Sequence, residues 1–209
     1  MAVVSASNRS LARPLGALLA AGVLAVLVSP RVIAAPKTQL EAGTFLVARP
    51  TMADPHFART VVLLLSHGEE GTLGVIINRR TRTVLSDLLP QLDTLTERQD
   101  SVFWGGPVGR DKLVFLLHAE EPPEDCEPVL AGVCTGNVLD LIEHGLDAEN
   151  PVAAFKTCVG YAGWAHGQLE WEIEQDGWYV LPATSQRVFE GDPKELWDEL
   201  IEVAEAPTA

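Results

Sequence analysis

The sequence predicts an α+β fold: a single domain with a mixed, mostly antiparallel, curved and partly barrel-like sheet and short flanking helices. The 209 residues are 47% hydrophobic and 21% charged, which suits one globular domain with a sizeable core. Apolar runs of strand length recur along the chain, and one pair is separated by a loop of hairpin length. The other connections are too short and irregular for the crossovers of a doubly wound sheet.

The N-terminal segment has the pattern of a secretory signal. Arg9 and Arg13 precede the apolar run 15–28, and small residues lead to a candidate cleavage site after Ala34 or Ala35. The run is short for a membrane-spanning helix, which needs about 20 apolar residues.

These features predict three parts in the chain. Residues 1–34 are expected to be a signal peptide or an N-terminal membrane tether, residues 35–42 a linker, and residues 43–205 the folded domain. The protein would then be exported to the periplasm or tethered, and would touch a membrane only through residues 15–28 if they are not cleaved. The alternative is a cytoplasmic protein whose start codon is misassigned.

The first part of the domain is predicted to form a strand and a hairpin. The strand covers residues 43–48, and Asp54 follows in a turn-rich segment as the cap of a single helical turn. The continuous apolar run 61–66 is typical of a strand buried on both faces. A glycine-flanked loop separates it from the apolar run 73–78, so residues 61–78 are predicted to be a hairpin.

The middle of the domain is predicted to alternate short helices and strands. A helix is expected at 84–89, closed by Pro90, and another from the N-cap residue Asn137 to about residue 146. Composition predicts strands at 102–104, 113–119 and 128–134.

The C-terminal part contains the stretch 160–172, in which a buried strand passes through a glycine-marked turn into a helix. The strand is expected to begin at about residue 152, and Gly177 is placed to end the helix as its C′ residue. A strand at 178–181 follows, and then a last helix from a capping box at Asp192 to about residue 204.

The charge of the chain disfavours direct nucleic-acid binding. Fifteen basic and 29 acidic residues give a net charge of −14, a field that repels a polyanion. The sequence also lacks a helix-turn-helix signal.

The sequence assigns no catalytic residue. It contains no nucleophile elbow, Walker loop or dinucleotide fingerprint, and residues 105–110 lack the lysine and hydroxyl of a phosphate loop. Asp54, His67 and His118 are the remaining candidates for a hydrolase of unassigned class. No two histidines stand four apart on a helix, so we expect no metal site, and no cofactor is indicated.

A ligand pocket is predicted at the turn before the helix that follows Trp164. No capping side chain precedes this helix, so its first amides, near Gly167 and Gln168, are available to a ligand. Tyr161 and Trp164 would form the wall of the pocket, and Gln168 would orient a polar ligand. Asn78, from the hairpin, completes this candidate set.

Two observations favour plain packing at this turn instead. Glu170 and Glu172 offset the positive end of the helix and would repel an anion. Tyr161 and Trp164 are also typical core aromatics.

The three cysteines leave two alternatives open. Cys126 and Cys134 lie close enough in sequence for a disulfide in an exported protein. Alternatively, both pack with Cys158 as small buried thiols.

Several segments together resemble the YqgE/AlgH family of bacterial proteins. These segments are 43–50, 66–67, 71–78, 105–108, 117–118, 160–164 and 167–170, together with Met52, Asp54-Pro55 and Phe57. The resemblance implies a single α+β domain with a curved sheet, without an established enzyme activity or cofactor. One branch of the family carries the label of a transcriptional regulator of polysaccharide synthesis.

The sequence departs from the family pattern in two places. Arg80 stands where the family usually has proline, and the segment 1–34 is unlike the cytoplasmic members. Because an exported protein cannot reach the chromosome, we expect a non-catalytic module that binds a small molecule or a protein. The alternatives are the transcriptional regulator of the family label and a hydrolase.

Overall fold

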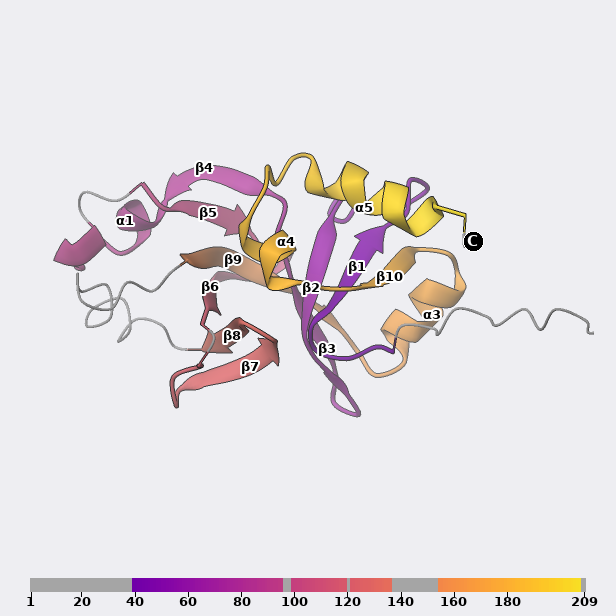
Figure 1. Ribbon diagram of the computed structural model, residues 1–209, viewed down its shortest axis with the longest axis horizontal. Coiled ribbons are helices and arrows are strands. Elements are labelled where there is room, and N and C mark those ends of the chain that lie inside the picture. The colour runs from indigo at the N-terminus through magenta and orange to yellow at the C-terminus, as the bar shows by residue number, and fades with distance from the viewer. Residues whose placement is uncertain (1–38, 96–98, 120, 137–153, 208–209) are drawn as a thin grey trace, which may run out of the picture. The chain divides into compact units, whose positions relative to one another are not determined.

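The computed structural model describes residues 39–95, 99–119, 121–136 and 154–207 (Figure 1). The signal or tether expected at 1–34 and the helix expected from Asn137 lie outside these residues, so both stay predictions. Within the described ranges, no helix has the length and apolar character needed to span a membrane.

One mostly antiparallel, curved sheet forms the domain, which confirms the predicted α+β class. Its strands follow the order β10-β1-β2-β3-β9-β6-β8-β7, with β5 parallel to β9 and β4 paired with β5. The strands are β1 (Thr44–Ala48), β2 (Val61–Gly68), β3 (Gly71–Ile76), β4 (Arg80–Val84), β5 (Ser101–Trp104), β6 (Val108–His118), β7 (Cys126–Leu130), β8 (Val133–Gly136), β9 (Ala154–Trp164) and β10 (Trp178–Pro182).

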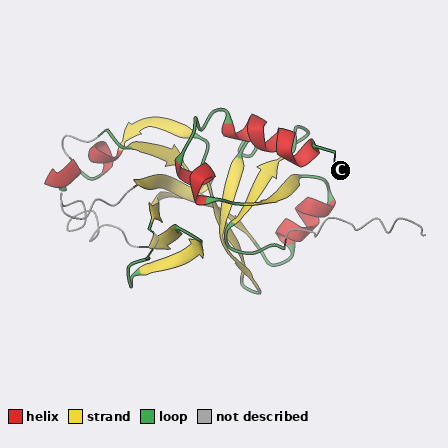
Figure 2. Cartoon of the chain, viewed as in Figure 1, coloured by secondary structure: helices red, strands yellow, loops and turns green. Residues whose placement is uncertain are grey.

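Short helices flank the sheet (Figure 2). The described residues form α1 (Leu85–Leu88), α3 (Gln168–Glu174), α4 (Ser185–Phe189), α5 (Leu196–Glu205) and one 3-10 turn, η1 (Asp93–Leu95).

Strand β1 is buried on both faces because helices cover both sides of it. Phe45 and Val47 belong to the hydrophobic cluster that contains residues of α4 and α5, while Leu46 and Ala48 belong to the cluster that contains Leu169 of α3. Strand β2 divides its apolar residues between the same two clusters. This sandwiching explains why both strands are continuous apolar runs in the sequence.

One predicted element is wrong in the structure, and one helix is absent from the predictions. The single strand expected at 128–134 is a hairpin, because the chain reverses between Leu130 and Val133 and pairs β7 with β8. Helix α4 was not predicted at all. It begins after Thr184, whose hydroxyl accepts the backbone N–H of Arg187 at 3.3 Å. Thr184 is therefore an N-cap residue, and it was the signal for this helix in the sequence.

The ends of two predicted helices also differ. Asp176, with φ +59°, is the C′ residue of α3, and Gly177 is the next residue, with its N–H donating to the Glu172 carbonyl at 2.9 Å. At the last helix, the Asp192 carboxylate accepts the Lys194 N–H at 3.0 Å, but the regular helix begins only at Leu196.

Strand β9 changes partner at Gly160. Before this residue β9 pairs with β5, and after it β9 pairs with β3, while β6 follows the opposite edge. Gly105, just beyond β5, joins the two halves: its N–H donates to the Val159 carbonyl and its carbonyl accepts the Ile76 N–H, both at 2.8 Å. A Cβ added at Gly160 would lie 2.6 Å from the Gly106 carbonyl oxygen.

We expect Gly160→Ala to lower the free energy of unfolding by about 2–5 kcal/mol. The φ of +72° costs an L-residue about 1–2 kcal/mol, and the contact with the carbonyl oxygens of Gly106 and Val108 adds overpacking of about 1–3 kcal/mol. Urea denaturation measures the change. Gly191→Ala is the matched control, since its φ is +85° but no atom lies within 4 Å of the added Cβ. Equal losses in the two variants would contradict the close approach at Gly160.

Candidate functional site

A carboxylate that is shared by two tryptophans holds the region where β9 turns into α3. Glu172 Oε2 accepts the indole N–H of Trp164 and that of Trp178, each at 2.9 Å. Gln168 Nε2 donates to Glu172 Oε1 at 3.0 Å. The two indoles also meet edge to face, with ring centroids 6.0 Å apart. Glu172 therefore fixes the position of both rings relative to α3.

A pocket of about 270 Å³, called the anchor pocket here, opens beside this cluster. Its lining combines aromatic and apolar side chains with two carboxylates and amides, from Met52, Asp54, Phe57, Pro107, Gly163, Trp164, Gln168, Trp171, Glu172, Gln175 and Gly177. Trp171 is 60% exposed, an unusual state for the largest side chain.

The start of α3 is organised by Gln168. Gly167 is the N-cap residue with a left-handed backbone and offers no capping side chain. Gln168 Oε1 accepts the Ala165 N–H at 3.1 Å, and the Gln168 N–H donates to the Ala165 carbonyl at 3.0 Å. The Gln168 amide thus links the turn to Glu172.

The predicted ligand-binding residues lie in three places. Trp164 and Gln168 line the anchor pocket, and Gly167 lies at the turn next to them. Tyr161 instead lines a groove of about 630 Å³ beside the β2–β3 hairpin. Asn78 is buried and bridges backbone groups: its Oδ1 accepts the Val61 N–H at 2.9 Å and its Nδ2 donates to the Arg59 carbonyl at 3.0 Å.

The predicted catalytic candidates hold separate partners. Asp54 Oδ1 accepts the backbone N–H of His56 at 2.8 Å and contacts its ring nitrogen at 3.1 Å. The His67 ring contacts the Thr72 hydroxyl at 2.7 Å and the Glu170 carboxylate at 3.6 Å. The part of the chain that the structure describes contains no cluster of three or more histidine, cysteine, aspartate or glutamate side chains suited to a metal.

His118, the third catalytic candidate, packs against the ring of Phe189 with centroids 5.3 Å apart. His67, in contrast, joins the β2–β3 hairpin to α3 through Glu170. The hairpin and the turn region are thereby neighbours, whereas Asn78 lies elsewhere.

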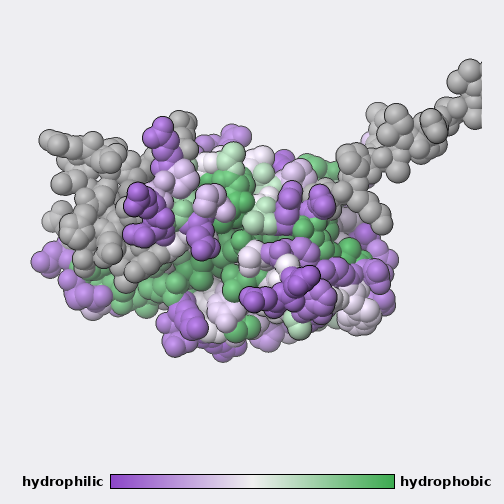
Figure 3. Space-filling view, turned by 90° about the horizontal axis from the view of Figure 1, so that it is seen from below, coloured by the Kyte–Doolittle hydropathy of each residue, from purple (hydrophilic) through white to green (hydrophobic). Residues whose placement is uncertain are grey.

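The groove lined by Tyr161 has a mixed character. Apolar residues of β2, β3 and β6 meet polar groups that include Lys112, Asp125 and Glu127. Figure 3 shows apolar surface in the middle of one face of the molecule, bordered by hydrophilic residues.

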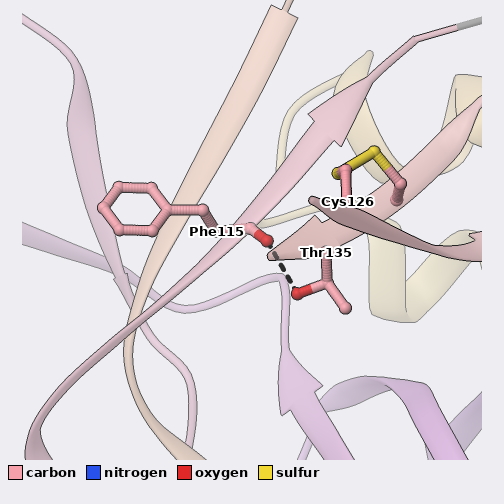
Figure 4. Close-up of a disulfide and its surroundings, with 4 residues drawn as sticks. Phe115, Cys126 and Thr135 are labelled. Atoms are coloured by element: carbon pink, nitrogen blue, oxygen red, sulfur yellow. Dashed lines mark hydrogen bonds between the residues drawn. A yellow bond between two sulfur atoms is a disulfide. The ribbon is translucent and has the colours of Figure 1, made fainter. Parts of the chain in front are cut away.

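Cys126 and Cys134 are joined by a disulfide across the β7–β8 hairpin (Figure 4). Beside it, the Thr135 hydroxyl donates to the Phe115 carbonyl at 2.9 Å and ties β8 to β6. Cys158 is a free, buried thiol, and its burial raises its pKa to about 12. The protonated thiol is a poor nucleophile.

Lys156 is a buried cation that the sequence analysis missed. It is 8% exposed on β9, donates to the Ile77 carbonyl at 3.2 Å, and lies over the Phe103 ring with Nζ 4.2 Å from the centroid. Burial lowers its pKa to about 8; the nearby Cys158 opposes this shift and Arg80 adds to it. The signal in the sequence was the position of Lys156 within a largely apolar strand, which indicates a buried charge.

The fold and the site define a single-domain α+β protein with an aromatic pocket at a strand-to-helix turn. A model of the AlgH-like family matches residues 45–208, and the chain therefore belongs to this family. A UPF0301 protein of Mycobacterium avium is 37% identical over 176 residues, covering 82% of this chain and 87% of that protein. One from Sinorhizobium medicae is 38% identical over 169 residues, with 75% and 82% covered.

Two solved structures share the fold. A crystal structure of a protein from Corynebacterium diphtheriae aligns with a TM-score of 0.71 and 26% identity, covering 83% of this chain and 92% of that one. The solution structure of the AlgH protein from Pseudomonas aeruginosa aligns with a TM-score of 0.65 and 29% identity, covering 80% and 89%. The resemblance stated from the sequence is confirmed.

We expect Glu172→Ala to lower the free energy of unfolding by about 3 kcal/mol. The change removes the acceptor of two indole N–H groups on largely buried rings, and an unpaired buried donor costs about 1–3 kcal/mol. Chemical denaturation measures the loss. Glu174→Ala, on the same helix with the same change in charge, is expected to stay within about 0.5 kcal/mol. A similar loss in both variants would contradict the role of the shared carboxylate.

We expect the stability of the protein to depend on pH through Lys156. Its pKa is lowered from 10.5 to about 8 on folding, so above pH 8 the unfolded chain binds more protons and stability rises. Below pH 8 both states are protonated, and the slope vanishes. Relative to Lys156→Met, the wild-type protein should gain about 1 kcal/mol between pH 7 and pH 9.

Urea denaturation at the two pH values measures this gain. The control is Lys112→Met, which removes an exposed lysine. Its difference in stability from the wild type should be the same at both pH values. A constant difference between wild type and Lys156→Met would mean that Lys156 titrates normally in the folded protein.

Proposed function

We propose that the protein is a non-catalytic binding module whose anchor pocket receives a small organic cation, such as a primary amine with an apolar portion. The observation that carries this proposal is the meeting of aromatic rings and two carboxylates in one pocket of about 270 Å³.

The chemistry of the lining favours a cation. Trp171 and Trp164 offer aromatic surface, on which a cation gains about 0.5–2 kcal/mol. The Asp54 side chain is 47% exposed at the pocket, so it is accessible as an ion-pair partner. Glu172 adds a second negative charge, although its oxygens already accept three hydrogen bonds.

The surroundings of the pocket support the same choice. The net charge of −14 attracts cations to the surface as a whole. Glu170, on the first turn of α3, adds negative charge next to the pocket. An anion would meet repulsion from all of these groups.

Neither alternative function has a supporting observation of its own. A hydrolase would need an assembled nucleophile and base, whereas Asp54, His67 and His118 are each engaged with different partners. A transcription regulator that contacts DNA directly would have to overcome the negative field of the chain.

We expect Trp171→Ala to weaken amine binding by about 3- to 30-fold, which corresponds to the loss of one cation–π contact. Isothermal titration with a panel of small alkyl and aryl amines measures the affinities, and the matched alcohols serve as uncharged controls. Val203→Ala removes an exposed apolar side chain on α5, outside the pocket lining, and should bind like the wild type.

A protein partner that presents a lysine side chain would use the same chemistry. A lysine-containing peptide that binds at least tenfold more tightly than any free amine would assign the pocket to a protein ligand. Absence of binding by every amine and by the peptide would overturn the proposal.

A further inference from the structure

A second pocket, called the basic pocket here, has the opposite electrostatic character. It has a volume of about 420 Å³ and is lined by His56, Asn78, Arg79, Arg80, Trp104 and Lys194. This volume lies in the usual range for sites that bind small molecules. The lining shares no residue with the anchor pocket. Three of its six residues are cations and none is acidic.

Within the described part of the chain, the cations of the basic pocket have no carboxylate partner. Among the described residues, no carboxylate oxygen lies within 4.0 Å of the charged groups of Arg79, Arg80 or Lys194. Elsewhere in the domain, in contrast, Arg49 pairs with Asp176 and Arg59 pairs with Asp198. In a chain with 29 acidic and 15 basic residues, cations that gather without an acid are unexpected.

Arg79 is held rigidly although its charge is not neutralised. Its guanidinium donates to the backbone carbonyls of Pro55, His56 and Ala58 at 3.2, 2.8 and 2.9 Å. These bonds engage three of its five N–H donors and fix its position, but they leave its positive charge in place. Burial lowers its pKa and the nearby Asp54 raises it.

An aromatic wall completes the lining. The Trp104 ring lies 5.1 Å from the Arg79 guanidinium carbon and 6.0 Å, nearly parallel, from the His56 ring. The half-exposed imidazole of His56 and the indole of Trp104 give the pocket aromatic surface, of the kind against which a ring of a ligand packs.

A buried ammonium adds to the positive field. Lys156 donates to the carbonyl of Ile77, the residue before Asn78, and it interacts electrostatically with Arg80. Phe103, the residue before Trp104, lies under its Nζ. Lys156 is therefore close to the basic pocket, although it does not line it.

We propose that the basic pocket binds a small phosphorylated compound, with the phosphate held by Arg80 and Lys194 and a planar group packed against Trp104 and His56. Phosphate is complementary in charge to these cations, and the arginine guanidinium in particular offers paired donors to its oxygens. A long polyanion is disfavoured because the rest of the chain is strongly acidic. The proposal is independent of the amine site in the anchor pocket.

Isothermal titration of the protein with inorganic phosphate, pyrophosphate, adenosine 5′-monophosphate and adenosine tests the proposal. We expect the phosphate-bearing probes to bind and adenosine to bind at least tenfold more weakly than its monophosphate. The double variant Arg80→Gln/Lys194→Gln should weaken monophosphate binding at least 30-fold. Both side chains lack partners in the described residues, so the variant should fold normally, which its melting temperature checks.

The matched control is the double variant Arg110→Gln/Arg187→Gln, which removes two positive charges outside the basic pocket. It should bind the monophosphate within about twofold of the wild type. Three outcomes would overturn the proposal: no binding by any phosphate-bearing probe, equal losses in the two double variants, or tighter binding of a 20-nucleotide single strand than of the monophosphate. The last outcome would assign the pocket to nucleic acid.

Discussion

The structure depends on the close main-chain contact between Gly160 of β9 and the glycines at 105–106. Only there can β9 leave β5 and continue along β3, because a side chain at Gly160 would collide with carbonyl oxygens. Gly105 carries the hydrogen bonds that join β9 and β3 across this junction. This contact between main-chain groups lets β9 change its partner and continue to Trp164, just before the turn into α3.

Much of the fold could be predicted from sequence because its signals are local. The continuous apolar runs of β1 and β2, the glycine-flanked hairpin loop and the turn after Trp164 each appear in a short window. The β7–β8 hairpin was not predicted, because its turn is short and its cysteines are equally compatible with a single strand. The change of β9 from β5 to β3 could not be predicted. These pairings join residues far apart in sequence, and they produce no periodic pattern of apolar residues within one segment.

The sites were less predictable than the fold, for electrostatic reasons. Sequence reasoning found Trp164 and Gln168, but it treated Glu172 only as a charge near a helix end. In the structure Glu172 is the acceptor that orders two indoles. The grouping of Arg79, Arg80 and Lys194 was also missed, because Lys194 is more than 100 residues from the two arginines and only the fold brings them together.

The outer strand β7 has a consequence for how molecules of this protein meet one another. Pro128, in the middle of β7, has no N–H to offer, and exposed Glu127 precedes it. The disulfide links β7 covalently to β8. At this edge of the sheet, the row of backbone hydrogen-bonding groups is therefore interrupted and flanked by a charge. Such features commonly prevent edge-to-edge pairing with another chain, and thus aggregation, at high concentration.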